Sequence, residues 1–292
     1  MNKYGLPLET GCATDTGPLF EGRQRLMGNV RAWVMAGWLA AAGGQALAQP
    51  AMCGPYRVAL YEYGSLAFRG TGPGTVGIDV DIVDEVARRT GCKFETFVDA
   101  RVRTWADLAH GALDITVSAI ETEERNRFAR FVIYMSGRNR LLVRDGLPTP
   151  VLTLQAFVEH RHLRLAVVKG FRHGAQWDDW IAKLRRQGRV DEYADASTAA
   201  RLVAVGRDAA LLSEPVVWGR ILADSKLEGR VTIIDAFPGD NYAAGFALSR
   251  ARVREDDARK IQEAIAAMRA DGSLYKIFSA YLPRSEALSS MP

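Results

Sequence analysis

The amino-acid sequence predicts an α/β protein built from two related units, each a mostly parallel sheet flanked by helices. The first observation is the order of the elements, because short apolar strands alternate with amphipathic helices, as in parallel sheets. The second is an internal echo, in which Gly111-Ala112-Leu113-Asp114 and Gly206-Arg207-Asp208 each lead into an apolar strand. The third is a change of unit near Pro148–Thr153, between the two halves.

The first half is predicted to begin with a strand at Arg57–Tyr61, followed by a hairpin tip at the glycine-rich turn 70–74. Apolar residues of 78–87 recur on one helical face, and Gly91 ends that helix. A second strand is predicted over Lys93–Val98. The remaining elements of this half are a short helix at Trp105–His110 and a buried strand at Asp114–Ala119.

The second half repeats the alternation of strands and helices. Its predicted elements are a strand at Leu163–Val168, a helix carrying Trp177, Trp180 and Leu184, a strand near Val190–Tyr193, and a helix at Ser197–Val205 followed by a strand. The C-terminal elements are a helix at Glu255–Ala270, closed by Gly272, and a short helix carrying Leu274, Ile277, Phe278 and Tyr281.

Residues 1–48 are predicted to be a signal peptide with an N-terminal extension. Arg23, Arg25 and Arg31 precede an uncharged apolar run at 32–42, and Ala46-Leu47-Ala48 forms a small-x-small cleavage pattern. At 1.5 Å per residue this run is too short to cross a bilayer core of about 30 Å. We therefore expect a periplasmic protein whose signal is removed; a buried core helix or a membrane anchor is the alternative.

Charge and composition exclude several classes of function. Without residues 1–48, the chain has 34 Lys and Arg (38 less four) against 31 Asp and Glu (34 less three). This mild excess, with no dense basic stripe, argues against a nucleic-acid partner. The histidines show no metal-ligand spacing, so we expect no metal and no cofactor; they are His110, His160, His162 and His173.

Two cysteines follow the predicted signal peptide, whereas Cys12 belongs to it. Cys53 precedes the first predicted strand and Cys92 precedes the second, so both thiols lie at one sheet end if these strands are parallel neighbours. An oxidising compartment favours a disulfide between them. Two inert buried thiols are the alternative.

Seven short motifs follow one another with a characteristic order and spacing. On these motifs the chain resembles extracytoplasmic solute-binding protein family 3, the polar amino-acid-binding components of ABC importers, over about residues 55–283. The motifs are Gly77-Ile78-Asp79-Val80-Asp81, Leu108-x-x-Gly111-x-x-Asp114, Thr122-x-x-Arg125, Lys169-Gly170, Gly206-Arg207-Asp208, Gly245-Phe246-Ala247 and Ala270-Asp271-Gly272-Ser273-Leu274.

The resemblance implies a two-lobed clamshell of the type II periplasmic-binding fold, with the ligand between the lobes. Lobe 1 would comprise residues 51–134 plus 245–292, and lobe 2 would comprise residues 139–240. Hinge segments at 134–138 and 241–244 would join them. The ligand would favour the closed state only through the extra contacts made there.

The resemblance also implies a ligand-binding role for residues near the third strand. Arg125 matches the arginine that holds the ligand carboxylate, which suits a guanidinium because it donates two parallel hydrogen bonds. Thr122 matches the residue that assists this arginine. Ser118 and Ala119 match the backbone that meets the ligand amine. The loop after the first strand would add Glu62, Tyr63 and the cleft-wall aromatic Phe68.

Two departures from the family pattern bear on the charge of the ligand. Ser213 stands where amino-acid-binding members carry an acid for the ligand ammonium, and Glu214 replaces that acid only if the backbone shifts, because neighbouring strand residues face opposite sides. After Gly170 the family has a small hydroxyl residue, whereas this chain has Phe171-Arg172. Arg172 is therefore a candidate to meet a second anionic group.

Losing an acid and gaining a cation both favour an anionic ligand. Arg101 and Arg103 add positive charge before Trp105, although each taken singly is expected on the surface. Arg101 and Phe171 are further candidates for ligand contact. We therefore expect a carboxylate without an amine, a dicarboxylate, or an acidic amino acid whose amine uses Glu62 or Glu214.

The resemblance leaves three functions to distinguish. The first is solute capture by a monomer that delivers its ligand to an ABC permease and ATPase. The second is an enzyme resembling the cyclohexadienyl dehydratases, with Glu214, Glu62 or His173 as acid or base. The third is a sensor acting on a membrane partner. The sequence contains no compact catalytic set, so we expect a binding protein and not an enzyme.

Overall fold

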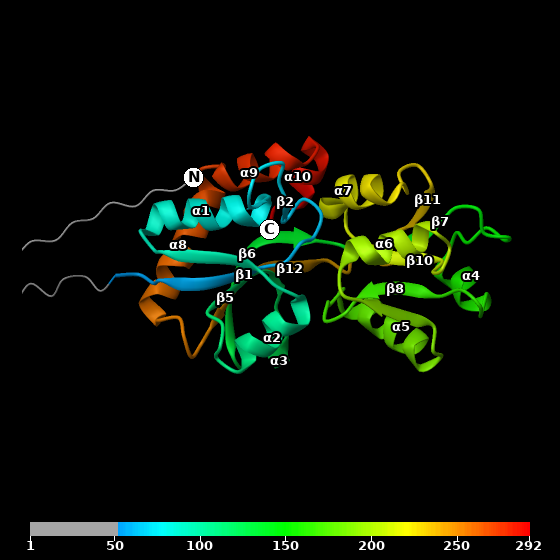
Figure 1. Cartoon of the computed structure of the whole chain (residues 1–292), viewed down its shortest axis with the longest axis horizontal. Helices are drawn as coiled ribbons and strands as arrows, with labels where there is room; N and C mark the ends of the chain where they lie inside the picture. The colour runs from blue at the N-terminus through cyan, green and yellow to red at the C-terminus, as the bar shows by residue number, and fades with distance from the viewer. Residues whose placement is uncertain (1–51) are drawn as a thin grey trace, which may run out of the picture. The chain divides into compact units, whose positions relative to one another are not determined.

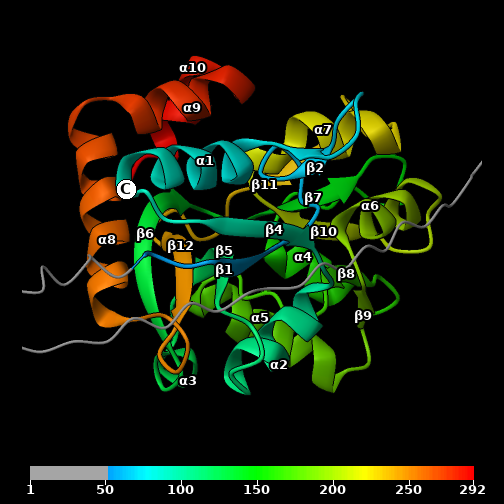
Figure 2. The ribbon, with the colours of Figure 1, turned by 60° about the vertical axis from the view of Figure 1, so that its left-hand side comes forward.

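The computed structural model describes residues 52–292, and the predicted signal peptide at 1–48 lies outside them (Figures 1 and 2). The first of two five-stranded sheets has the order β4-β1-β5-β12-β6. Strand β1 pairs in parallel with β4 and β5, whereas β12 pairs antiparallel with β5 and β6. The bounds are β1 Tyr56–Leu60, β4 Phe94–Val98, β5 Ile115–Ile120, β6 Ala129–Gly137 and β12 Tyr242–Ser249.

The second sheet has the order β11-β7-β10-β8-β9. Strands β10, β8 and β9 run parallel, and β7 pairs antiparallel with both β10 and β11. A separate hairpin of β2 and β3 confirms the predicted tip at 70–74. The bounds are β2 Phe68–Arg69, β3 Thr75–Val76, β7 Arg140–Arg144, β8 Leu165–Val168, β9 Val190–Tyr193, β10 Ala210–Ser213 and β11 Val231–Ile234.

Both sheets are less parallel than the sequence predicts, since each contains two parallel and two antiparallel pairings. The parallel strands are those recognised by their alternation with helices. The antiparallel strands β6, β7, β11 and β12 are not among the strands predicted from the sequence. They extend each sheet because an open edge next to a buried strand can be paired by any extended segment that returns to it.

Helices cover the sheets on both faces (Figure 1). On the first sheet, α1, α8 and α9 contact one another on one side, and α2 and α3 lie on the other. On the second sheet, α6 and α7 lie on one side and α5 on the other. The bounds are α1 Ile78–Thr90, α2 Arg101–Ala109, α3 Glu123–Asn126, α4 Leu154–Glu159, α5 Ala175–Arg186, α6 Ala196–Ala204, α7 Pro215–Ser225, α8 Glu255–Ala270, α9 Ser273–Tyr281 and α10 Arg284–Ser289.

The amphipathic face predicted for α1 is the face that packs on the sheet. Ile78, Ile82, Val83 and Val86 are buried, and Gly91 ends the helix in the left-handed conformation. Predicted and observed bounds also agree for α8 and β9. Within residues 52–292, every helix is too short or too polar to span a bilayer.

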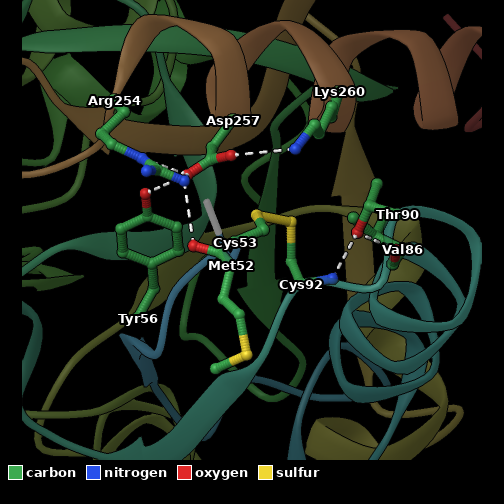
Figure 3. Close-up of a disulfide and its surroundings, with 9 residues drawn as sticks. All are labelled: Met52, Cys53, Tyr56, Val86, Thr90, Cys92, Arg254, Asp257 and Lys260. Atoms are coloured by element: carbon green, nitrogen blue, oxygen red, sulfur yellow. Dashed lines mark hydrogen bonds and ion pairs between the residues drawn. A yellow bond between two sulfur atoms is a disulfide. The ribbon is translucent and has the colours of Figure 1, made fainter. Parts of the chain in front are cut away.

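Cys53 and Cys92 form a disulfide, as the sequence analysis favours (Figure 3). Cys53 lies just before β1 and Cys92 just before β4, and these strands are parallel neighbours. Beside the bond, the Cys92 amide donates to the Thr90 hydroxyl at 3.1 Å. The bond therefore fixes the start of β1 to the connection between α1 and β4.

A buried carboxylate lies close to this disulfide in Figure 3. Asp257, near the start of α8, accepts hydrogen bonds from the Tyr56 hydroxyl at 2.6 Å and from Arg254 Nε at 2.8 Å. Lys260 Nζ donates to it at 3.3 Å. Because a buried carboxylate is costly without partners, these contacts connect the first strand to α8 with defined geometry.

Candidate functional site

Several of the predicted site residues meet at a small cavity, here called the Arg125 cavity. It has only ≈ 20 Å³ of space for the centres of water molecules, about enough for one ordered water. A solute of several atoms therefore requires the surrounding side chains to move. The cavity is lined by Tyr61, Tyr63, Leu66, Arg101, Ser118, Ile120, Arg125, Met135, Asn139, Phe171, Arg172, Glu214, Tyr242 and Ala244.

Arg125 is held rigidly at this cavity by the short helix α3. Thr122 caps the helix, its hydroxyl accepting from the Arg125 amide at 3.2 Å. The guanidinium donates to the carbonyl oxygens of Ile120 at 2.8 Å and Gly170 at 3.3 Å, and its carbon lies 3.6 Å from the centre of the Trp105 ring. Thr122 and Gly170 thus position the arginine but do not line the cavity themselves.

The Arg125 side chain is isolated from compensating charge. The residue is 8% exposed, and among residues 52–292 it makes no ion pair. Burial, and to a lesser extent the positive charges of Arg101 and Arg172, lower the pKa of Arg125 to about 9. An anion entering the cavity would relieve both effects, because it would replace lost hydration and oppose the neighbouring charges.

Arg101 is a second buried cation, which corrects the expectation that it lies on the surface. It is 5% exposed and donates to the carbonyl oxygens of Val117 at 3.2 Å and Ser118 at 3.0 Å. Its guanidinium stacks over the Tyr61 ring at 4.0 Å. Arg103, two residues further along α2, is exposed and pairs with Asp99, as expected of a surface residue.

Ser118 is fixed by a buried hydrogen-bond network below the cavity. The Ser118 hydroxyl and the Tyr134 hydroxyl donate to the Asp79 carboxylate at 2.8 and 2.7 Å. The Ser118 amide donates to the Tyr134 hydroxyl at 2.7 Å. Burial raises the pKa of Asp79 to about 6, against the lowering effect of these bonds. Ala119, the neighbouring candidate, is buried and does not line the cavity.

Three aromatic rings fill much of the site. The Tyr61 and Tyr63 rings are stacked, with centroids 5.9 Å apart. The Phe171 ring meets both edge-on, at 5.4 and 5.0 Å. Phe171 therefore lies in the cavity wall, as the sequence suggests.

Two predicted loop residues point elsewhere. The Phe68 ring packs against Tyr281 at 6.3 Å and under the Arg220 guanidinium at 3.8 Å, outside the cavity. Glu62 is exposed and interacts with Arg69 at 3.8 Å. Neither lines the Arg125 cavity, because the loop after β1 turns these side chains toward other neighbours.

The acid at the cavity is Glu214 and not its neighbour Ser213. Ser213 ends β10, is 1% exposed and does not line the cavity. Glu214 lies past the strand as the residue preceding α7, so the alternation of strand faces no longer applies to it. Because the strand ends at Ser213, the backbone direction changes there, and Glu214 instead of Ser213 reaches the cavity.

Burial largely removes the charge of Glu214 at neutral pH. The residue is 6% exposed, and its Oε2 atom has no hydrogen-bond partner among residues 52–292. Burial, opposed by a hydrogen bond from Tyr63 and assisted by the charge of Asp79, raises the pKa of Glu214 to about 8. A lining acid is therefore present, but in its neutral form it does not balance the arginines.

Arg172 also lines the cavity, at its exposed side. Its side chain is 47% exposed and pairs with Glu124 at 3.5 Å. Solvent weakens the charge of Arg172 relative to that of the two buried arginines. Sequence patterns did not indicate Met135, Asn139, Tyr242 or Ala244 as lining residues, although three of them fall in the expected hinge segments.

The raised pKa of Glu214 makes the stability of the protein pH-dependent. From pH 4.5 to about 8 the folded protein keeps a proton that the unfolded chain has lost, so stability falls as pH rises. Asp79 acts with the same sign but only up to about pH 6. Between pH 6.5 and 8, we expect Glu214 to contribute a fall of up to about 1.4 kcal/mol per pH unit.

Urea unfolding at pH 6.5, 7.2 and 8.0 measures this dependence. The variant Glu214→Gln cannot ionise and is expected to show a much smaller fall in unfolding free energy over this range. The exposed Glu228→Gln should keep the wild-type dependence. Equal pH dependence in wild type and Glu214→Gln would contradict the assignment.

Among residues 52–292, no group of three or more His, Cys, Asp or Glu side chains is arranged to hold a metal ion. The chemistry offered by the Arg125 cavity is instead that of two buried guanidinium groups, three aromatic rings and a protonated carboxyl. Such a set recognises a small solute through hydrogen bonds and ring contacts.

The two mixed sheets with flanking helices define the class of two-lobed type II periplasmic-binding folds. The chain belongs to the bacterial extracellular solute-binding proteins, family 3, whose family model matches residues 59–284. The resemblance drawn from the sequence motifs is thereby confirmed. The family is one of binding proteins, in agreement with the expectation that this chain is not an enzyme.

Several solved structures share this fold at low sequence identity. A histidine kinase sensor domain with similarity to periplasmic binding proteins is 19% identical, covering 79% of this chain and 96% of its own, with a TM-score of 0.65. An ancestral arginine-binding protein bound to arginine is 21% identical (80% and 100% covered, TM-score 0.64). A putative L-cystine ABC transporter from Listeria monocytogenes is 19% identical (80% and 97%, TM-score 0.65). No curated protein matches the chain.

Proposed function

We propose that this protein is the substrate-binding component of an ABC importer and captures a small, anionic, carboxylate-bearing solute. The proposal rests on the burial and the positive charge of Arg125 and Arg101. Both are more than nine-tenths buried at one cavity, and neither makes an ion pair among residues 52–292. A buried charge without a partner is unfavourable, so a carboxylate is the natural complement of this site.

In this proposal the site lies between two lobes, residues 51–134 plus 245–292 and residues 139–240. Contacts of the loop after β8 support closure over the ligand. The Gly170 carbonyl accepts from Arg125, the Phe171 ring packs on Tyr61, and Arg172 pairs with Glu124. Segments 134–138 and 241–244 would serve as the hinge.

The proposed setting of this function is the periplasm. The signal peptide proposed at residues 1–48 would direct export, and a monomer would pass the solute to the permease and ATPase of an inner-membrane importer. Membership of a family of extracellular solute-binding proteins supports this setting. Proteins of similar fold that are named as amino-acid-binding proteins or ABC transporters are in keeping with it.

Replacing Arg125 by Gln tests the function directly. We expect wild-type protein, unfolded and refolded to remove any carried-over solute, to bind L-glutamate or succinate in preference to L-arginine or L-glutamine. The Arg125→Gln variant should bind the preferred acid at least thirtyfold more weakly, about 2 kcal/mol, because two charge-assisted hydrogen bonds are lost. Isothermal titration calorimetry measures both affinities.

The matched control is Arg127→Gln, which removes an exposed arginine two residues away. This variant should retain wild-type affinity. Binding that is restricted to basic or neutral amino acids would contradict the anionic ligand, and an unchanged affinity in Arg125→Gln would contradict the role of Arg125.

A further inference from the structure

The Arg125 cavity is lined by a second buried guanidinium, that of Arg101. We infer that the ligand carries two acidic groups, one held by Arg125 and the other by Arg101, and this inference rests on the proposed function. The first step is that one hydrogen-bond donor of Arg101 is unused among the described residues. Two of its nitrogens donate to backbone carbonyls, but its Nε atom is buried with no hydrogen-bond partner among residues 52–292.

The second step is that the surrounding residues do not neutralise Arg101. The rings of Tyr61, Trp105 and Phe171 lie at 4.0, 5.1 and 5.7 Å from its guanidinium carbon. Ring faces attract a cation but do not cancel its charge. The carboxyl of Glu214 is largely protonated near neutral pH, and that of Asp79 is occupied by two hydroxyl donors.

The third step is that one acidic group does not satisfy both arginines well. Arg101 is anchored on the Ser118 carbonyl and Arg125 on the Ile120 carbonyl, two residues apart on β5. At the rise of a strand, these anchors are on the order of 7 Å apart. Because both guanidinium groups also lie over the Trp105 ring, their positions are fixed independently of the ligand. Guanidinium groups held from separate anchors can each take one carboxylate of a diacid with a short chain.

The fourth step is that the structure offers room on the Arg101 side. Tyr61, Arg101 and Phe171 form a common wall with a second, larger cavity of ≈ 350 Å³. A change in the Phe171 side chain would join the two spaces. A diacid with one group at Arg125 would then extend toward Arg101 without displacing the sheet.

Matched ligands test this inference on the wild-type protein. Calorimetric titrations would compare succinate with monomethyl succinate, which keeps the chain length but removes one charge. We expect succinate to bind at least tenfold more tightly. Equal affinities would overturn the inference, and this comparison needs no variant.

Variants then locate the second acidic group. In Arg101→Gln the preference for succinate should fall to less than threefold, whereas Arg127→Gln, which removes an exposed arginine that lines neither cavity, should preserve it. If Arg101→Gln fails to fold, Arg101→Lys keeps the charge and should retain a reduced preference. If Arg101→Gln weakens diacid and monoester by the same factor, both arginines hold one carboxylate and the inference is wrong.

The two proposals fail in different ways. If monocarboxylates bind and depend on Arg125, but a second acidic group adds nothing, only the diacid inference fails. If neither L-glutamate nor succinate binds, or if Arg125→Gln changes the affinity for neither of them, the proposed function and the diacid inference both fail.

Discussion

Replacing Cys53 and Cys92 by Ser is expected to lower the free energy of unfolding by about 4 kcal/mol. The bond joins residues separated by 39 positions, and the loss of loop entropy in the unfolded chain predicts a stabilisation of this size. Domains of this kind are stable by about 5–15 kcal/mol, so the change is a large fraction of the total. The start of β1 would lose its covalent attachment to β4.

Guanidinium chloride unfolding of the oxidised protein, the protein reduced with dithiothreitol, and the double variant measures this effect. Reduced wild type and the double variant should unfold at similar, lower denaturant concentrations. Dithiothreitol should not change the double variant, which controls for effects of the reductant itself. An unchanged midpoint on reduction would show that the bond contributes no net stability.

Replacing Gly64 by Ala is expected to weaken solute binding at least hundredfold, about 3 kcal/mol. Gly64 has φ 54° and lies in the loop after β1, against α7. An added Cβ atom would lie 2.4 Å from both Cα and Cβ of Val217, a buried residue. Backbone at this distance cannot yield as a flexible side chain does, so the loop bearing Tyr63 must separate from α7, which begins after Glu214.

Gly229→Ala is the matched control for the backbone strain of the substitution. Gly229 has a similar φ of 65° but no atom within 4 Å of the added Cβ position. Both variants should lose stability from the left-handed backbone, about 1–2 kcal/mol. Only Gly64→Ala should lose affinity for succinate or L-glutamate in calorimetry. Equal affinities in the two variants would contradict the role of the loop contact in closure.

The sequence predicted the parts of the fold that depend on local pattern. The apolar face of α1, the left-handed end at Gly91 and the strand β9 follow from periodicity and turn chemistry, which neighbouring residues determine. The disulfide is also predicted from the sequence, because each of the two cysteines precedes a strand and the two strands are expected to be parallel neighbours. The antiparallel strands β6, β7, β11 and β12 were missed because pairing between distant segments leaves little local signal.

The site was predicted less completely, since its residues depend on tertiary contacts. Arg125 carried a motif, whereas Arg101 looked like a surface residue because nothing local indicates that Tyr61 and Trp105 would cover it. The sequence leaves the role of Glu214 open. Side chains alternate between the two faces of a sheet only within a strand, so the direction of Glu214 depends on whether β10 ends at Ser213. The resemblance places Phe68 at the cleft wall, whereas its ring packs against Tyr281, a partner far along the chain that no local pattern indicates.

The position of Trp105 has an optical consequence. Its indole ring lies under the guanidinium groups of both Arg125 and Arg101, at 3.6 and 5.1 Å, although it does not line the cavity. An indole excited state has a larger dipole than its ground state, so its emission wavelength responds to nearby charge. A solute that neutralises or moves these arginines would change the field on the ring. The protein therefore contains an intrinsic fluorophore next to the Arg125 cavity, through which occupancy of the proposed site can be followed without a label.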